Sequence, residues 1–134
     1  MRRIDLWFLM LATVSLLSGI LMGIWMGVVH DFRFAPVHAH LNFLGWTSLA
    51  LFGLAYKVYP ALNTRLATIH FSLAVVGTAI FPVGIGLSLA GITPVVAILG
   101  SFIWLAAVLV FLVNLGRLVV TPSAPSVQQI VAAE

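Results

Sequence analysis

Residues 36–59 read PVHAHLNFLGWTSLALFGLAYKVY, and Lys57 is the only Lys, Arg, Asp or Glu among them. A helix of about 20 apolar residues crosses the hydrocarbon core of a bilayer, so this stretch is long enough to span a membrane. Three more stretches of the same kind accompany it, at residues 6–29, 66–89 and 94–120. The sequence therefore predicts an all-α integral membrane protein whose four transmembrane helices form one bundle within residues 1–120.

The composition agrees with a lipid environment. Hydrophobic residues make up 63% of the 134-residue chain and charged residues only 7%, with a mean hydropathy of +1.22. This leaves too little polar surface for a water-soluble domain. The net charge of +3 reflects scarce acids rather than a basic patch, so nucleic acid is not an expected partner. Because the chain has no Cys, disulfides, thiolate zinc sites and iron-sulfur clusters are excluded.

The distribution of cations predicts the orientation. Membrane proteins keep Lys and Arg on the cytoplasmic side. In a four-helix topology only Arg33 lies on one side, and the other side holds Arg2, Arg3, Lys57, Arg65 and Arg117. Both termini are therefore expected in the cytoplasm, with residues 121–134 as a flexible cytoplasmic tail. In a Gram-negative bacterium the protein would be a multi-pass protein of the inner membrane, with the loop around Arg33 facing the periplasm.

Small residues recur at helical spacing in three of the predicted helices. The rows are Ser15, Gly19, Gly23 and Gly27; His70, Gly77, Gly84 and Gly91; and Gly100, Ala107 and Asn114. Such rows let helix backbones approach closely. We interpret all three primarily as packing seams, although the first could also admit a flat ligand.

Imidazole is the main candidate for chemistry. The sequence contains no paired carboxylates, no nucleophile motif and no phosphate-binding loop. Ionisable residues at membrane depth are costly and indicate function, and His38 and His40 open the second helix. Residues two apart on an α-helix are separated by about 200°, so these two rings cannot chelate one ion. They would instead face two clefts, as axial ligands of two haem groups or as interfacial imidazoles that only form hydrogen bonds.

Several neighbours of His38 could support a bound cofactor. Asn42 and Gly45 follow it by four and seven residues on the same helix face, where the amide could orient a ring and the glycine could clear space. Arg33, just outside the helix, could pair with haem propionates. His30 is expected at the outer interface. His70 lies too far along the bundle to share a haem with His38, and we expect it to be structural.

The second and third helices resemble part of a known family. HAHLNFLGW (38–46), followed by Tyr56 and Pro60, resembles the tenth helix of the catalytic subunit of haem-copper oxidases, especially the C-family (cbb-type) enzymes and the related nitric-oxide reductases. ATIHFSLAVVGTAIF (67–81), continuing to Gly91, is similar to the eleventh helix, and NLGR (114–117) is weakly similar to the end of the twelfth.

The resemblance implies a cofactor and its ligands. His38 matches the axial ligand of the high-spin haem and His40 that of the low-spin haem, whereas His70 matches no ligand. The family has twelve helices in three four-helix arcs, and this chain is about one third of that size. It lacks the helices that carry the copper ligands, so no copper is expected and oxygen reduction is not predicted. A chain of four helices whose second helix carries the H-x-H motif is similar to one of these arcs.

A homo-oligomer follows from this comparison. Three copies of four helices make twelve, and a trimer would place His38 of one copy across a cleft from His40 of the next. A twofold dimer is the alternative. The resulting hypothesis is a copper-free membrane haem b protein that transfers electrons with bis-His ligation and has a redox partner protein. Whether the protein is an enzyme stays open.

Three other functions remain open from the sequence. A labile axial ligand would give an NO- or O2-binding sensor or a minor reductase. Purely structural histidines would suit an accessory or assembly subunit of a respiratory complex. Finally, His30, His38 and His40 from neighbouring copies could bind copper or zinc at the outer face.

Overall fold

The computed structural model describes residues 3–120, so the predicted tail at 121–134 lies outside the described residues. Along this part of the chain the order is α1 (Ile4–Val29), α2 (Ala35–His40), the π-helix η1 (Leu41–Ser48), α3 (Leu49–Val58), the short 3₁₀ helix η2 (Pro60–Leu62), α4 (Arg65–Leu89) and α5 (Val95–Val120). No strand occurs among these residues, which confirms the all-α prediction. The helical stretches begin and end within two residues of the predicted ranges.

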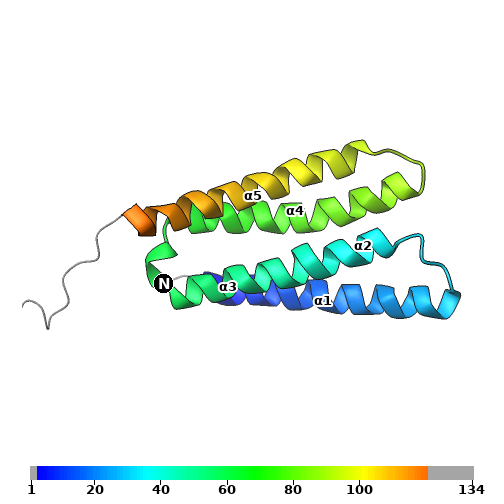
Figure 1. Cartoon of the computed structure of the whole chain (residues 1–134), viewed down its shortest axis with the longest axis horizontal. Helices are drawn as coiled ribbons and strands as arrows, with labels where there is room; N and C mark the ends of the chain where they lie inside the picture. Colours follow the sequence, from blue (N-terminus) through cyan, green and yellow to red (C-terminus); the bar gives the residue numbers. More distant parts are fainter. Residues whose placement is uncertain (1–2, 121–134) are drawn as a thin grey trace, which may run out of the picture.

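The helices form two antiparallel hairpins (Figure 1). In the first, α1 packs along the rod made of α2, η1 and α3, and in the second α4 packs along α5. Both hairpins turn at the same end of the molecule, and the chain begins at the opposite end. Lys57, Arg65 and Arg117 occupy the ends of α3, α4 and α5 on the side of the N-terminus. Three of the five cations predicted on one side therefore lie at one end of the fold, whereas Arg2 lies outside the described residues.

The helix that carries H-x-H changes its winding after His40. Residues 35–58 are helical without interruption, but residues 41–48 are π-helical. Two hydroxyls in this segment bond to carbonyls five residues back, Thr47 Oγ1 to Asn42 O at 3.1 Å and Ser48 Oγ to Phe43 O at 2.9 Å. Such π segments occur often at functional sites. The sequence predicts an ordinary α-helix here, and the π segment at 41–48 departs from that prediction.

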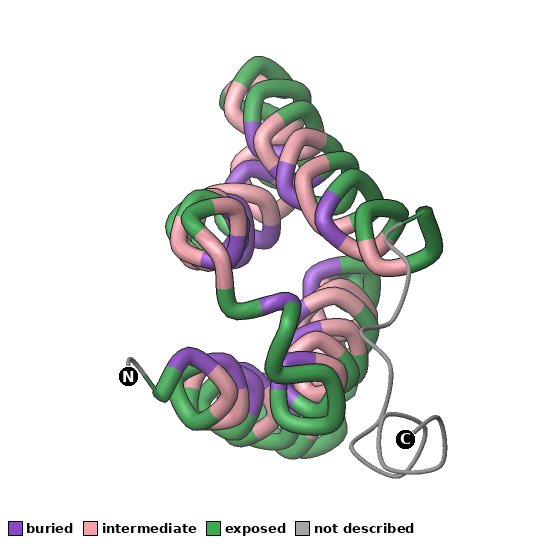
Figure 2. Tube along the Cα trace, turned by 90° about the vertical axis from the view of Figure 1, so that its left-hand side faces the viewer, coloured by how far each residue is buried: buried purple, intermediate pink, exposed green. Residues whose placement is uncertain are grey.

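The surface of the bundle is apolar, as in a membrane protein. Among the described residues, α1, α4 and α5 are each long and apolar enough to cross a bilayer. Their outer faces expose many large hydrophobic side chains, for example Leu21, Phe102 and Leu112 at 58%, 64% and 59%. Figure 2 shows the buried residues on the sides of the helices that face one another and the exposed residues outside. We conclude that this is a helical membrane protein.

Two of the small-residue rows are packing seams, except that Gly27 at the end of the first row is exposed and an added Cβ there would meet nothing within 4 Å. A Cβ on Gly19 or Gly23 of α1 would lie 2.5 Å from Asn42 Nδ2 or 3.0 Å from His38 Cε1, so this row seats the α2 and η1 side chains. In the second hairpin, a Cβ on Gly100 would lie 2.7 Å from Phe81 Cα. Helix backbones approach this closely only where side chains are absent.

The small-residue row predicted on the third helix is a packing seam only in part. Gly77 and Gly84 pack against α5, but Gly91 has a φ of 72° and lies in the turn after α4 with nothing within 4 Å of an added Cβ. It serves the left-handed turn that only glycine adopts easily. His70, predicted on the same seam, instead lies in the centre of the bundle between α1, α3 and α5.

Candidate functional site

His38 projects from α2 toward α1. Its Nδ1–H donates a hydrogen bond of 2.8 Å to the backbone oxygen of Gly19. Because a carbonyl can only accept, this contact places the proton on Nδ1 and the lone pair on Nε2. The ring is half-buried against the small-residue row of α1.

His40 projects toward the other hairpin. Its ring packs edge to face on Phe81 of α4, with the ring centroids 5.0 Å apart. Its Nδ1–H donates to the backbone oxygen of Pro36 at 2.7 Å, so His40 also carries its lone pair on Nε2. The two rings therefore face different helices, as the two-residue spacing predicts.

Asn42 and Gly45 lie on the same side of the rod as His38. The Asn42 amide donates to the backbone oxygen of His38 at 2.8 Å, and its nitrogen lies 3.4 Å from Nε2 of the same residue. A Cβ on Gly45 would lie 2.6 Å from Ser15 Cβ, so this glycine allows α1 to approach. Asn42 thus lies against the His38 ring and bonds to its backbone, whereas Gly45 clears space for a helix.

Arg33 and Asp31 form an ion pair in the loop between α1 and α2. Arg33 Nη2 lies 2.7 Å from Asp31 Oδ2, and Arg33 Nε contacts both carboxylate oxygens. Bidentate pairs of this kind are strongly oriented. The guanidinium proposed from the sequence as a partner of haem propionates thus already has an anionic partner within the chain.

This pair makes the acid titration of the loop predictable. The hydrogen bonds from Arg33 lower the pKa of the Asp31 carboxyl below its ordinary value. The ion pair therefore persists at any pH above the ordinary pKa of aspartate and is lost only as the pH falls through the lowered pKa. Arg33→Gln is expected to return the Asp31 pKa to its usual range. NMR titration of the carboxyl carbon in micelles measures it, and an unchanged pKa would contradict the pairing.

His30 does not join the other histidines. It ends α1 in the left-handed region, with φ of 52°, and is exposed. Within residues 3–120 no group of three His, Cys, Asp or Glu side chains comes close enough to hold a metal ion. A copper or zinc site built from His30, His38 and His40 would therefore require residues from more than one copy.

His70 lies in an aromatic cluster that the sequence pattern does not predict. It is fully buried, and its Nδ1 is hydrogen-bonded to the Tyr56 hydroxyl at 3.0 Å. Its ring centroid lies 4.9, 4.6 and 5.2 Å from the rings of Phe8, Phe52 and Phe111. These residues come from α1, α3 and α5, so the cluster joins both hairpins at the centre of the bundle.

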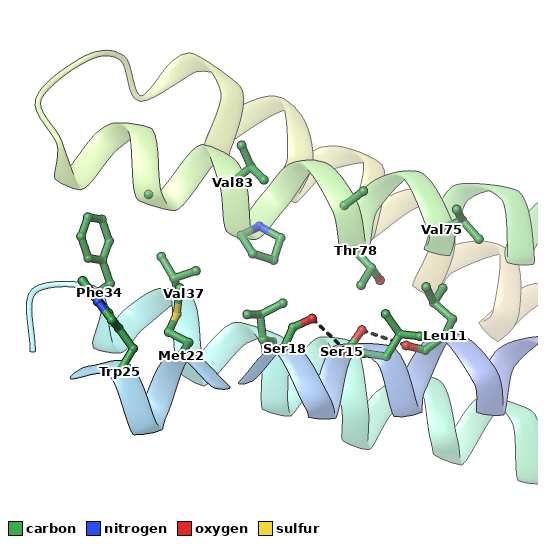
Figure 3. A pocket seen from close by; sticks show the side chains of 15 residues that line it. Leu11, Ser15, Ser18, Met22, Trp25, Phe34, Val37, Val75, Thr78 and Val83 are labelled. Carbon is green, nitrogen blue, oxygen red and sulfur yellow. Dashed lines mark hydrogen bonds between the residues drawn. The ribbon is translucent and has the colours of Figure 1, made fainter. Parts of the chain in front are cut away.

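A cavity of about 650 Å³ lies between α1 and α4, beside α2 (Figure 3). Its lining runs along α1 from Leu11 to Trp25 and is almost entirely apolar. Val37 and Leu41 line it from the H-x-H rod, whereas His38 and His40 do not. The cavity is therefore separate from the imidazole site, and its size is typical of small-molecule sites.

Comparisons of this chain with protein-family models, with curated proteins and with solved structures give no match.

Proposed function

We propose that this protein is a small, copper-free membrane haem b protein related to the haem-copper oxidases, and that it transfers electrons. The observation that carries the proposal is the hydrogen bonding of the two imidazoles. His38 and His40 each donate Nδ1–H to a backbone carbonyl and keep the lone pair on Nε2. This is the usual arrangement of histidine ligands, because the outer hydrogen bond orients the ring and makes it more basic.

The donor chemistry fits haem iron. A neutral imidazole nitrogen is a common axial ligand, and Arg33 lies near the outer end of the same helix. His40 is the more available of the two, because the described residues place no hydrogen-bond donor on its Nε2, whereas the amide of Asn42 lies 3.4 Å from Nε2 of His38. Haem would supply reversible one-electron chemistry, and ligation by two histidines suits outer-sphere electron transfer to a redox partner protein.

The two rings face different helices, so one chain cannot supply both axial ligands of one haem. We therefore propose a homotrimer in which His38 of one copy and His40 of the next complete each site, with a dimer as the alternative. Residues 35–58 would be the fourth transmembrane segment. The cationic end of the bundle would face the cytoplasm and the histidine end the periplasm, across the inner membrane.

The pyridine haemochrome and metal content of the purified protein, with its native mass in detergent, test this proposal. We expect haem b without copper in the wild type and nearly complete loss of haem in either His38→Ala or His40→Ala. A reduced spectrum unaffected by CO is expected for bis-His ligation, whereas a CO-shifted Soret band would indicate a gas sensor or minor reductase. Colourless protein after haem reconstitution would refute the proposal.

His30→Gln separates the haem proposal from a site for bound copper or zinc ions. Haem content is expected to stay at the wild-type level, because His30 is exposed in the loop and contributes no ligand to the proposed haem. Loss of bound copper or zinc in this variant would support the alternative.

A non-enzymatic accessory or assembly subunit is the second candidate function. It is favoured by the position of His38, which packs on Gly23 and bonds to Gly19 within the helix seam. On this alternative His38→Ala would destabilise the first hairpin. Neither His38→Ala nor His40→Ala would change the visible absorption spectrum of the purified protein.

A further inference from the structure

The cavity between α1 and α4 is bordered by small residues on both helices. Ser15 and Ser18 line it from α1, and Ala79 and Gly86 line it from α4. Small residues normally let two membrane helices pack directly against each other. These residues instead border a volume of about 650 Å³, and no charged residue among 3–120 lines it. An occupant must be uncharged where it lies between the helices, because an unpaired charge at membrane depth is costly.

The dimensions of the cavity fit one hydrocarbon chain. Its lining runs along α1 from Leu11 to Trp25, which is about 20 Å of helix rise. A volume of about 650 Å³ over this length leaves a cross-section of about 30 Å². A hydrocarbon chain at carbon separations of about 4 Å needs about 20 Å². A helix about 10 Å wide needs about 80 Å², so the cavity is too narrow for a helix of a second copy.

Trp25 is the residue at which the cavity can bind a polar group. In Figure 3 it lies beside Phe34 at one end of the cavity, with its indole nitrogen on the edge of the ring nearest Phe34. The indole N–H can only donate, and it has no hydrogen-bond partner within residues 3–120. The hydroxyls of Ser15 and Ser18 already donate to backbone carbonyls. A ligand with a hydrogen-bond acceptor at this end would pair with the indole.

The depth of Trp25 in the membrane matches that of a lipid ester group. The helix α1 runs from Ile4 to Val29, and Trp25 lies about 13 Å from its midpoint along the helix axis. The hydrocarbon core of a bilayer extends about 15 Å on each side of its midplane. With α1 centred in the bilayer, the indole lies just inside the boundary at which acyl chains join their ester groups. Tryptophan is enriched at this boundary because its ring is apolar and its N–H is polar.

We propose that the cavity binds one acyl chain of a phospholipid, from the leaflet at the end of the bundle where both hairpins turn. The ester carbonyl of this chain accepts a hydrogen bond from Trp25 Nε1–H, and the chain lies along α1 toward Leu11. An extended chain of about sixteen carbons is about 20 Å long, because each C–C bond of about 1.5 Å advances it by about 1.25 Å. The lipid thereby fills the space between the two hairpins on this side of the bundle.

Two lipids that differ only in their carbonyl groups test the proposal, dipalmitoyl phosphatidylcholine and its ether analogue dihexadecyl phosphatidylcholine. Because their masses differ, native mass spectrometry of the full chain in detergent with an equimolar mixture measures both together. We expect one retained lipid per chain and about three to ten times more ester than ether lipid, which is the value of one hydrogen bond. Equal retention of the two lipids, or no retained lipid, would overturn the proposal.

Substitution of Trp25 isolates the hydrogen bond. Trp25→Phe keeps an aromatic ring without the N–H and is expected to abolish the preference for the ester, while retention of the ether lipid stays at the wild-type level. Trp7→Phe is the matched control, because Trp7 is 57% exposed near the other end of α1 and does not line this cavity. A preference that survives in Trp25→Phe, or that is lost in Trp7→Phe, is incompatible with the proposed hydrogen bond.

A second pair of variants checks that the lipid occupies the cavity. An added Cβ on Gly86 would lie 3.9 Å from Val37 Cγ2, an ordinary contact, so Gly86→Leu can extend into the cavity without disturbing the backbone. It is expected to reduce retention of both lipids by about tenfold or more. Gly116→Leu is the matched control, because nothing lies within 4 Å of an added Cβ there. Equal lipid retention by the two variants would place the lipid elsewhere and contradict the proposal.

The same variants distinguish a lipid from a second copy of the chain. If Gly86→Leu changed the native mass of the assembly and left lipid retention unchanged, the cavity would be an interface between copies and the lipid proposal would be wrong. None of these measurements depends on haem, so the lipid proposal and the haem proposal fail separately.

Discussion

Gly84→Ala is expected to destabilise the second hairpin by about 3 kcal/mol, near the upper end of the usual cost of overpacking a core. The added Cβ would lie 2.5 Å from the carbonyl carbon of Val96 and 2.6 Å from Cα of Ala97. These are backbone atoms of α5, so no side-chain rotation relieves the clash. The two helices must separate along a contact that is otherwise close-packed. Reversible unfolding in mixed micelles, followed by circular dichroism, measures the change.

Gly116→Ala is the control for this experiment. Position 116 also lies within a long helix, but an added Cβ meets nothing within 4 Å. Alanine favours the helix by about 1 kcal/mol relative to glycine, so Gly116→Ala is expected to be neutral or stabilising. If the two variants unfolded alike, the close approach of α4 to α5 at Gly84 would be wrong.

Apolar length and the spacing of small residues predicted most of the fold. Four apolar stretches gave helical ranges close to those observed, and three of the observed helices are long and apolar enough to cross a bilayer. Gly19, Gly23, Gly77 and Gly84 lie in seams because their spacing keeps them on one helix face. The prediction from spacing was wrong at Gly91. The seven-residue repeat continues past the end of α4, and Gly91 lies in a left-handed turn.

The candidate site was predictable only in part. The angle between His38 and His40 follows from helix geometry alone, and the two rings do face different helices. The carbonyl partners of these rings depend on the packing of α1 and on the winding of α2. The π segment at 41–48 gave no recognisable sequence signal, although Thr47 and Ser48 supply hydroxyls that bond five residues back.

The aromatic cluster and the cavity could not be predicted, because both are assembled from residues far apart in sequence. Phe8, Phe52, His70 and Phe111 meet only when the two hairpins dock. Likewise, the cavity is lined by residues of α1, α2, η1 and α4 that are far apart in sequence.

His70→Ala is expected to lower the free energy of unfolding by about 3–5 kcal/mol, the usual cost of removing a large buried ring. The imidazole is fully buried and its ring contacts reach both hairpins, so the cavity left behind lies where the hairpins meet. Unfolding in mixed micelles measures the change. A cost below about 1 kcal/mol would show that His70 is not a core residue.

A double-mutant cycle with Tyr56 separates the hydrogen bond from the packing. Tyr56→Phe and His70→Phe each leave one partner of the 3.0 Å hydrogen bond unpaired in an apolar core, and each is expected to cost about 1–3 kcal/mol. Because replacing both partners by apolar rings removes the unpaired groups, the double variant is expected to cost less than the sum of the single variants. Haem content in His70→Phe should equal that of the wild type, since this side chain acts through packing and supplies no iron ligand in the proposed site. Additive costs would mean that the Tyr56–His70 hydrogen bond contributes nothing to stability. Loss of haem in His70→Phe would show that His70 belongs to the cofactor site.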